Sequence, residues 1–155
     1  MTKLPFGFEK PQDSPGFLLW QTTTLWERHI KKALECFELT HSQFVIMALL
    51  LWLCAHECQP TQADLAMWSK LDKMNVSKSL KALTERGLVF RSDHGADLRA
   101  KTMQLTEEGK LLVQQIVPLV EAADALFFGS VAPHEEQMLI TLFSKLVAGG
   151  YDGEK

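Results

Sequence analysis

The sequence lacks the features of a secreted, membrane-spanning or disulfide-stabilised protein. It has only three cysteines, an odd number without a disulfide framework, which indicates a reducing compartment. No apolar run reaches the roughly 18 residues that a membrane span needs, and the longest stretch, 44–55, is too short. The N-terminus also has no charged segment followed by an apolar core. We therefore expect a cytoplasmic chain that does not enter the membrane.

Residue patterns that carry catalysis are also missing. The chain has no glycine-rich phosphate loop, no nucleophile with a suitably spaced base and no dense cluster of histidines and carboxylates. We therefore expect neither an enzyme nor a cofactor or metal site. Cys54 and Cys58 share one face of a predicted helix, whereas His56 points away from both. A thiol- or metal-responsive regulator using this pair remains an alternative, although free cysteines are most often buried.

Length and charge favour one domain with a basic end. A chain of 155 residues that is 46% hydrophobic can bury a sizeable core in a single domain. Residues 60–101 hold eight basic and five acidic side chains, a balance of +3, while the whole chain carries −3. A basic lobe on an acidic body suits a protein that contacts DNA at one end.

Capping signals and apolar periodicity predict six helices. The second is apolar on nearly every side, which indicates a central position. The first 13 residues show no periodicity, so we interpret them as an extended arm whose Phe6 and Phe8 pack on the body or on a partner. The expected helices run from Pro15 to about Phe37, Thr40 to about Glu57, Thr61 to Ser69, Asp72 or Ser69 to Glu85, Thr106 to Phe128 and Pro133 to about Ala148.

The stretch 74–106 predicts a helix followed by a two-stranded hairpin. Val76, Leu80 and Leu83 share one helical face and should meet a core. Gly87 is typical of the left-handed residue that ends a helix. Residues 88–91 have strand composition, 92–96 form a glycine-containing turn cluster, and 101–105 form the return strand.

The opposite face of this helix carries short polar and basic side chains that suit DNA. Asparagine can pair in two places with an adenine edge, serine can contact bases or phosphates, and lysine neutralises phosphate. Arginine at a hairpin tip suits the narrow minor groove. An ordinary solvated surface is the alternative for each charge. The candidate DNA-binding residues are Lys73, Asn75, Ser77, Lys78, Lys81, Arg91 and Arg99.

Three segments in this region share their order and spacing with a known pattern. They are Glu85-Arg86-Gly87-Leu88-Val89, Asp97-Leu98-Arg99 and Leu105-Thr106-Glu107-Glu108-Gly109. Together with Leu83 and Arg91 they resemble the "LxxxGLVxR … DxR … LTxxG" pattern of MarR-family transcription regulators. The resemblance implies a mainly α fold with a small β-hairpin wing, in which N- and C-terminal dimerisation helices flank a winged helix-turn-helix core. Residues 1–155 would form a single domain, with helices at 15–58 and 106–149 and the DNA-binding lobe at 59–105.

The same resemblance implies partners and a mode of action. The chain would be a homodimeric repressor of a pseudopalindromic operator in double-stranded DNA, released by a small aromatic or phenolic effector. The departure from the family's peroxide sensors is that Phe17, Leu18, Leu19 and Trp20 stand where those have a reactive cysteine. A winged helix that binds only protein remains a second alternative. The candidate ligand-binding residues, each of which could instead be ordinary core, are Trp20, Trp26, His29, His41 and Phe44.

Overall fold

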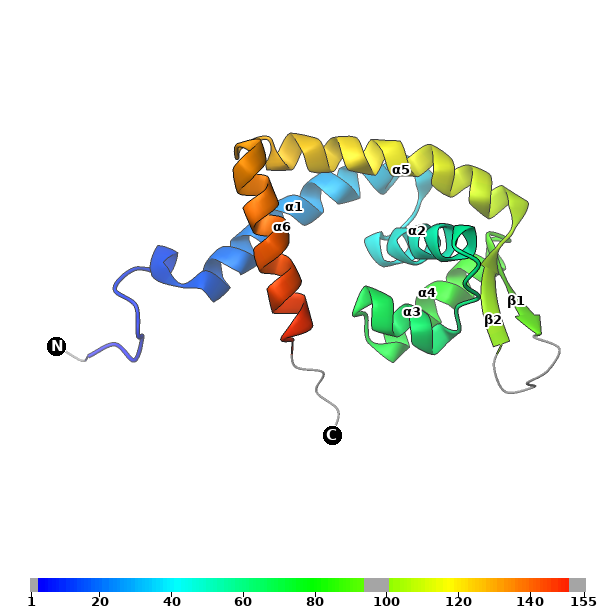
Figure 1. Ribbon diagram of the computed structural model, residues 1–155, viewed down its shortest axis with the longest axis horizontal. Coiled ribbons are helices and arrows are strands. Elements are labelled where there is room, and N and C mark those ends of the chain that lie inside the picture. The colour runs from blue at the N-terminus through cyan, green and yellow to red at the C-terminus, as the bar shows by residue number, and fades with distance from the viewer. Residues whose placement is uncertain (1–2, 94–100, 151–155) are drawn as a thin grey trace.

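Helices dominate the computed structural model, which describes residues 3–93 and 101–150 (Figure 1). The sequence predictions of six α-helices and one hairpin are confirmed in this part of the chain. A turn of 3-10 helix, η1, precedes α1, and a second, η2, follows it. The elements are η1 (Pro11–Asp13), α1 (Pro15–Leu34), η2 (Glu35–Phe37), α2 (His41–Ala55), α3 (Gln62–Ser69), α4 (Lys73–Glu85), β1 (Val89–Asp93), β2 (Lys101–Leu105), α5 (Glu107–Phe128) and α6 (Pro133–Ala148).

Side-chain caps begin the helices at the predicted residues. The Thr40 hydroxyl accepts a hydrogen bond from the backbone N–H of Gln43, 3.2 Å away, and the Gln43 side-chain oxygen accepts one from the Thr40 N–H. Thr61 and Asp64 make the same reciprocal pair at α3. At α4 the cap is Asp72, whose carboxylate accepts from the Asn75 N–H at 2.7 Å. These bonds satisfy N–H groups that have no partner within a helix.

Three element boundaries differ from the sequence predictions. The first helix stops at Leu34, and the η2 turn takes its place up to Phe37 because Glu38 adopts a left-handed conformation with φ of 54°. The second ends at Ala55, two residues early. Strand β1 continues to Asp93, through residues that were assigned to the turn.

Helix α2 lies at the centre of the core. Its buried side chains meet α3, α4, α5 and β2, which explains why it is apolar on nearly every side. The predicted inner face of α4 is confirmed, since Val76, Leu80 and Leu83 are all buried. We call α2, α3, α4 and the hairpin the winged-helix lobe. The buried α2 residues are Phe44, Ile46, Met47, Leu50 and Leu53.

The turn after α4 is joined closely to the start of α5. Gly87 has φ of +70°, and the Leu88 N–H reaches back to the Leu83 carbonyl at 3.0 Å. The Thr106 hydroxyl donates to the Gly87 carbonyl at 2.7 Å and accepts from the Gly109 N–H at 3.0 Å. A Cβ atom on Gly109 would collide with the Leu88 carbonyl. These contacts give the two family-like segments around Gly87 and Gly109 a structural role.

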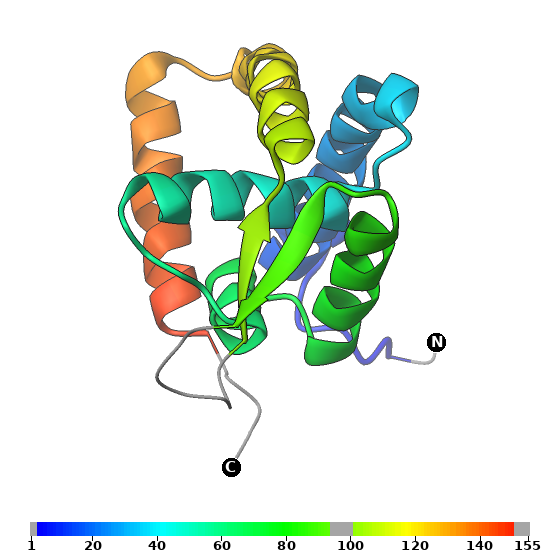
Figure 2. The same ribbon diagram turned by 90° about the vertical axis from the view of Figure 1, so that its right-hand side faces the viewer.

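Strands β1 and β2 form an antiparallel pair in which Val89 lies opposite Leu105 and Arg91 opposite Met103. The Met103 N–H donates to the Pro60 carbonyl at 2.8 Å, so the hairpin is attached to the segment that leads into α3. Figure 2 shows the hairpin beside α4, with α5 on the opposite side of α2. The hairpin therefore belongs to the same rigid lobe as the helix-turn-helix.

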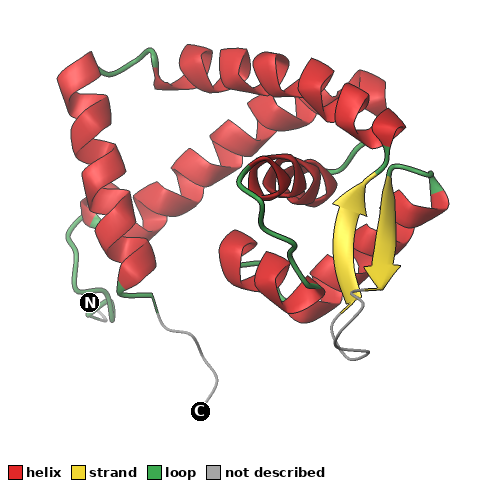
Figure 3. Ribbon diagram, turned by 45° about the vertical axis from the view of Figure 1, so that its right-hand side comes forward, coloured by secondary structure: helices red, strands yellow, loops and turns green. Residues whose placement is uncertain are grey.

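The terminal helices, α1 and α6, are much less covered. Only Ile30 and Leu34 are buried among the 20 residues of α1, and α6 has no buried residue. Figures 1 and 3 show α6 standing apart from the winged-helix lobe, while α1 packs along α5. By length and composition alone, one described helix, α5, could cross a membrane. It nevertheless packs against α1 and α2 and buries Val113 and Ile116, as a core helix does.

Candidate nucleic-acid interface

Helix α4 presents a polar and basic face to solvent. Its inner stripe is held by the core, so the side chains on the opposite face point away from the lobe. Ser77, Lys78 and Lys81 are exposed, and Met74 is 81% exposed at the first turn. Lys73, at the start of the helix, is exposed as well. The face is small enough to lie in a DNA major groove and carries donors and positive charge.

Asn75 lies partly behind this face. Its side-chain oxygen accepts a hydrogen bond from the buried Ser79 hydroxyl at 3.3 Å, and its side chain is half-buried. A bidentate contact with adenine needs that oxygen and the amide N–H together. The side-chain oxygen of Asn75 keeps a second lone pair for another hydrogen bond. In the described part of the chain, the side-chain N–H groups of Asn75 donate to no other residue. Ser79, which sequence reasoning did not single out, thus orients Asn75.

The hairpin contributes a second basic position beside α4. Arg91 is exposed on β1, opposite Met103. The predicted contact at the hairpin tip, Arg99, lies outside the described residues. The described part of the interface therefore consists of α4 and the base of the hairpin.

Arg86 links the end of α4 to a distant part of the chain. Its guanidinium donates to the Glu38 carbonyl at 2.9 Å and to the Phe37 carbonyl at 3.2 Å. Those carbonyls belong to the turn between α1 and α2, so Arg86 connects the end of α4 to the end of the first terminal helix. No local sequence pattern predicts this contact, because the partners are backbone atoms 48 and 49 residues away.

Two of the predicted ligand-binding residues meet at the junction of α1, α2 and α5. The rings of Trp26 and His41 pack edge to face with centroids 5.0 Å apart. The Trp26 indole N–H donates to a carboxylate oxygen of Asp124 at 2.7 Å. Burial lowers the pKa of His41, against the opposing influence of Glu27 and Asp124. This junction therefore holds a neutral imidazole, an indole and a carboxylate in contact.

The other predicted ligand residues lie in different surroundings. The His29 ring meets Phe127 of α5 at 5.6 Å and lines an open apolar groove of about 1040 Å³ between α1, α5 and α6. Phe44 is buried in the core, at 8% exposure. Trp20 is 70% exposed, on the part of α1 that precedes the junction. Asp124 and Phe127 were missed, since a single aspartate or phenylalanine on an apolar helix gives no local signal.

The three cysteines lie in different environments. Cys36 and Cys58 are exposed and Cys54 is half-buried. Burial raises the pKa of the Cys54 thiol, which disfavours the reactive thiolate, although nearby Lys110 opposes the shift. Over residues 3–93 and 101–150, no three histidine, cysteine or acidic side chains are close enough to hold a metal ion.

Comparisons with known proteins identify related chains. A family model described as "ArnR1-like, winged-helix domain" matches residues 35–122. The chain is also 40% identical over 128 residues to an uncharacterised HTH-type transcriptional regulator, YdcH, of Bacillus subtilis. That alignment covers 83% of this chain and 87% of YdcH.

Solved structures share the fold. BpsR of Bordetella bronchiseptica, whose DNA binding is regulated by 6-hydroxynicotinic acid, superposes with a TM-score of 0.79 at 24% identity, over 92% of this chain and 97% of BpsR. A mutant of Escherichia coli MarR complexed with operator DNA superposes with a TM-score of 0.75 at 22% identity, over 84% and 91% of the two chains. At these identities the likeness establishes the architecture, in which the six helices and the hairpin have the same arrangement.

Proposed function

Because this chain belongs to the ArnR1-like winged-helix family and is related to an HTH-type transcriptional regulator, we propose that it is a homodimeric repressor of the MarR type, released from its operator by a small-molecule effector. The observation that carries the proposal is the exposed basic face of α4 beside the hairpin, on a lobe whose core is complete. Such a face supplies phosphate contacts and base contacts from one rigid element. The protein would act in the cytoplasm, where its DNA target lies.

The DNA-binding residues take separate roles in this proposal. Lys78 and Lys81 neutralise phosphates, whereas Ser77 and Asn75 contact base edges in the major groove. Lys73 and Arg91 contact the flanking backbone. Arg99 enters the minor groove beside each half-site, where a narrow groove strengthens the negative potential.

A dimer follows from the uncovered terminal helices. Leu142 and Phe143 of α6 are 50% and 38% exposed, and the groove between α1 and α6 is apolar and open. Apolar surface of this extent marks an interaction site. A two-fold dimer would place two α4 helices about one DNA turn apart, roughly 10 base pairs, and its operator would be pseudopalindromic.

The effector would bind near the junction of α1, α2 and α5. Trp26 offers a flat apolar surface, and His41 and Asp124 offer polar groups that could accept a hydrogen bond from the hydroxyl group of a phenolic ligand. A small aromatic effector is supported by BpsR, whose DNA binding responds to 6-hydroxynicotinic acid. Arg86 would transmit the change, because it joins the α1–α2 turn to the end of α4.

The test is a selection of bound sequences from random DNA, followed by titrations on the selected site. We expect a pseudopalindrome, and a sequence pool without enrichment would contradict the proposal. Lys78→Ala should weaken binding to all DNA and reduce the salt dependence by about one counterion. Asn75→Ala should instead relax preference at one base pair.

Arg99 is tested on paired operators that differ only in their flanks. Arg99→Ala should cost most affinity on A·T-rich flanks, because it reads groove width. Arg99→Lys should restore only part of the loss, since an ammonium is more strongly hydrated. An equal loss on both flanks would mean that Arg99 contacts phosphate only.

A further inference from the structure

The segment before α1 carries large apolar side chains that this chain does not cover. Leu4 and Phe6 are 71% and 74% exposed, and Phe8 is 49% exposed. In Figure 1 the segment projects past the first turn of α1, beyond the rest of the molecule. We call residues 3–10 the N-terminal arm. Exposed phenylalanines on a segment outside the helices and strands are costly in water and indicate a surface that becomes buried elsewhere.

The arm leaves α1 in a defined direction. The η1 turn is closed by a bond from the Asp13 N–H to the Lys10 carbonyl at 3.0 Å, and the Asp13 carboxylate accepts from the Lys10 N–H at 3.3 Å. The Ser14 hydroxyl then caps α1 by accepting from the Phe17 N–H at 3.2 Å. Proline at 11 and at 15 restricts the backbone on either side of the turn. This joint holds the arm out from the helix.

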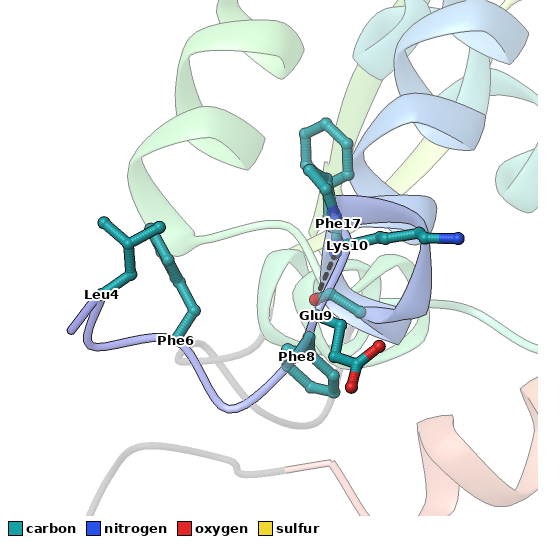
Figure 4. Close-up of a pocket in the computed structure, with 8 residues that line it drawn as sticks. Leu4, Phe6, Phe8, Glu9, Lys10 and Phe17 are labelled. Atoms are coloured by element: carbon teal, nitrogen blue, oxygen red, sulfur yellow. Dashed lines mark hydrogen bonds between the residues drawn. The ribbon is translucent and has the colours of Figure 1, made fainter. Parts of the chain in front are cut away.

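Between the arm and the start of α1 there is an open apolar hollow of about 530 Å³. Phe6, Phe8 and Phe17 line it, and Figure 4 shows them coming from both sides, the first two from the arm and the third from α1. The next residue, Leu18, lines the larger groove between α1, α5 and α6. The hollow and the groove therefore meet at the first turn of α1, so the arm adjoins the apolar surface that we assign to the dimer.

We propose that the arm of each protomer closes over a terminal helix of the second copy and buries Phe6 and Phe8 there. This inference rests on the proposed homodimer. The arm bends at residues 5 and 7–10 in this structure. Fully extended, its eight residues would reach roughly 26 Å, more than twice the approximately 10–12 Å diameter of a helix, so the arm is long enough to cross one. A second copy is the occupant because the hollow adjoins, at the first turn of α1, the apolar groove that we assign to the dimer.

Photo-crosslinking between differently tagged copies tests the contact directly. A photoreactive phenylalanine analogue at Phe6 should join the two tags in the full-length dimer. The matched control is the same analogue at Phe90, a 41% exposed phenylalanine on the winged-helix lobe, where no crosslink between copies is expected. A dimer in which the Phe6 analogue reacts only within its own chain, or not at all, would overturn the arm proposal while leaving the dimer intact.

A double substitution measures the strength of the contact. Phe6→Ser with Phe8→Ser should raise the dimer dissociation constant in sedimentation by at least about a hundredfold, since each buried phenylalanine contributes at least about a tenfold step. Thermal unfolding of the dilute chain should be unchanged, because neither residue is buried within its own chain. Glu9→Ser is the control and should leave the constant unchanged. An unchanged constant for the double variant overturns the proposal, whereas an unsubstituted chain that is monomeric at micromolar concentration contradicts the proposed homodimer itself.

Discussion

The winged-helix lobe buries its apolar side chains within the chain, whereas the terminal helices leave most of theirs exposed. In the lobe, α2 alone buries five large side chains, and the hairpin, α3 and α4 close around it. In α6 every residue of the apolar stripe stays accessible, and α1 is buried only near its C-terminal end. The lobe is therefore stabilised by contacts within one chain, whereas the terminal helices need contacts from outside it. This difference means that substitutions in the two regions should be detected by different measurements.

The largest expected effect is in the lobe. Leu80 of α4 is 1% exposed, and Leu80→Ala should lower the free energy of unfolding by about 2–5 kcal/mol, through lost burial and the cavity that remains. Denaturant titration would measure the change. The matched substitution in α6, Leu142→Ala, removes a half-exposed side chain and should mainly raise the dimer dissociation constant. Equal losses of unfolding free energy, with the dimer unaffected, would remove the distinction between the two regions.

Two glycine-to-alanine substitutions should differ in the sign of their effect on the free energy of unfolding. Gly109→Ala puts a methyl group against the Leu88 carbonyl, a backbone atom that cannot move away alone, and should cost about 1–3 kcal/mol. Gly16→Ala, in the first turn of α1, meets only the Ser14 hydroxyl oxygen at 3.9 Å. It should be neutral or stabilise by up to about 1 kcal/mol, because alanine has less backbone freedom to lose. Thermal unfolding of both variants is the measurement, and a destabilised Gly16→Ala protein would contradict the prediction.

Arg86 bridges the two regions, so its removal should have a moderate effect on both. Arg86→Ala should cost about 1 kcal/mol of unfolding free energy, since its hydrogen bonds to Phe37 and Glu38 are solvent-exposed. It should also lower operator affinity, because the C-terminal end of α4 loses an anchor. Arg86→Lys can make one of the two hydrogen bonds, so its unfolding free energy and operator affinity should lie between those of Arg86→Ala and the unsubstituted protein. Equal operator affinity of the unsubstituted protein, Arg86→Ala and Arg86→Lys would contradict the prediction that Arg86 connects the two regions.

The smallest expected effect is a pH dependence from His41. Burial holds the pKa of this imidazole below its ordinary value of roughly 6.5. The unfolded chain therefore binds the proton more readily than the folded chain does. The contribution of neutral His41 to the free energy of unfolding is complete above the ordinary pKa and is lost as the pH falls below it. The melting temperature should fall between about pH 7 and pH 5, and His41→Gln should flatten part of that decline. An identical decline in the variant would assign the pH dependence to other groups.

The sequence by itself determined the helix starts and the faces of the helices. The bonds from Thr40 to Gln43, from Thr61 to Asp64 and from Asp72 to Asn75 each span three residues, so the local chain contains both partners. The inner stripe of α4 follows from helical periodicity in the same way. The helix ends were less predictable, because the left-handed Glu38 that separates η2 from α2 is not a residue that favours this conformation.

Only the tertiary structure decided which distant groups meet. The Trp26 indole finds Asp124 across 98 residues, and Arg86 finds the backbone carbonyl of Phe37 across 49. Neither partner is marked by its own neighbours in the sequence, because a single polar group is satisfied by whichever complementary atom the packed helices bring within about 3 Å. What covers the exposed apolar faces of α1 and α6 likewise depends on tertiary structure. Periodicity predicts that these faces are apolar, but whether this chain or a second copy covers them depends on how the helices pack.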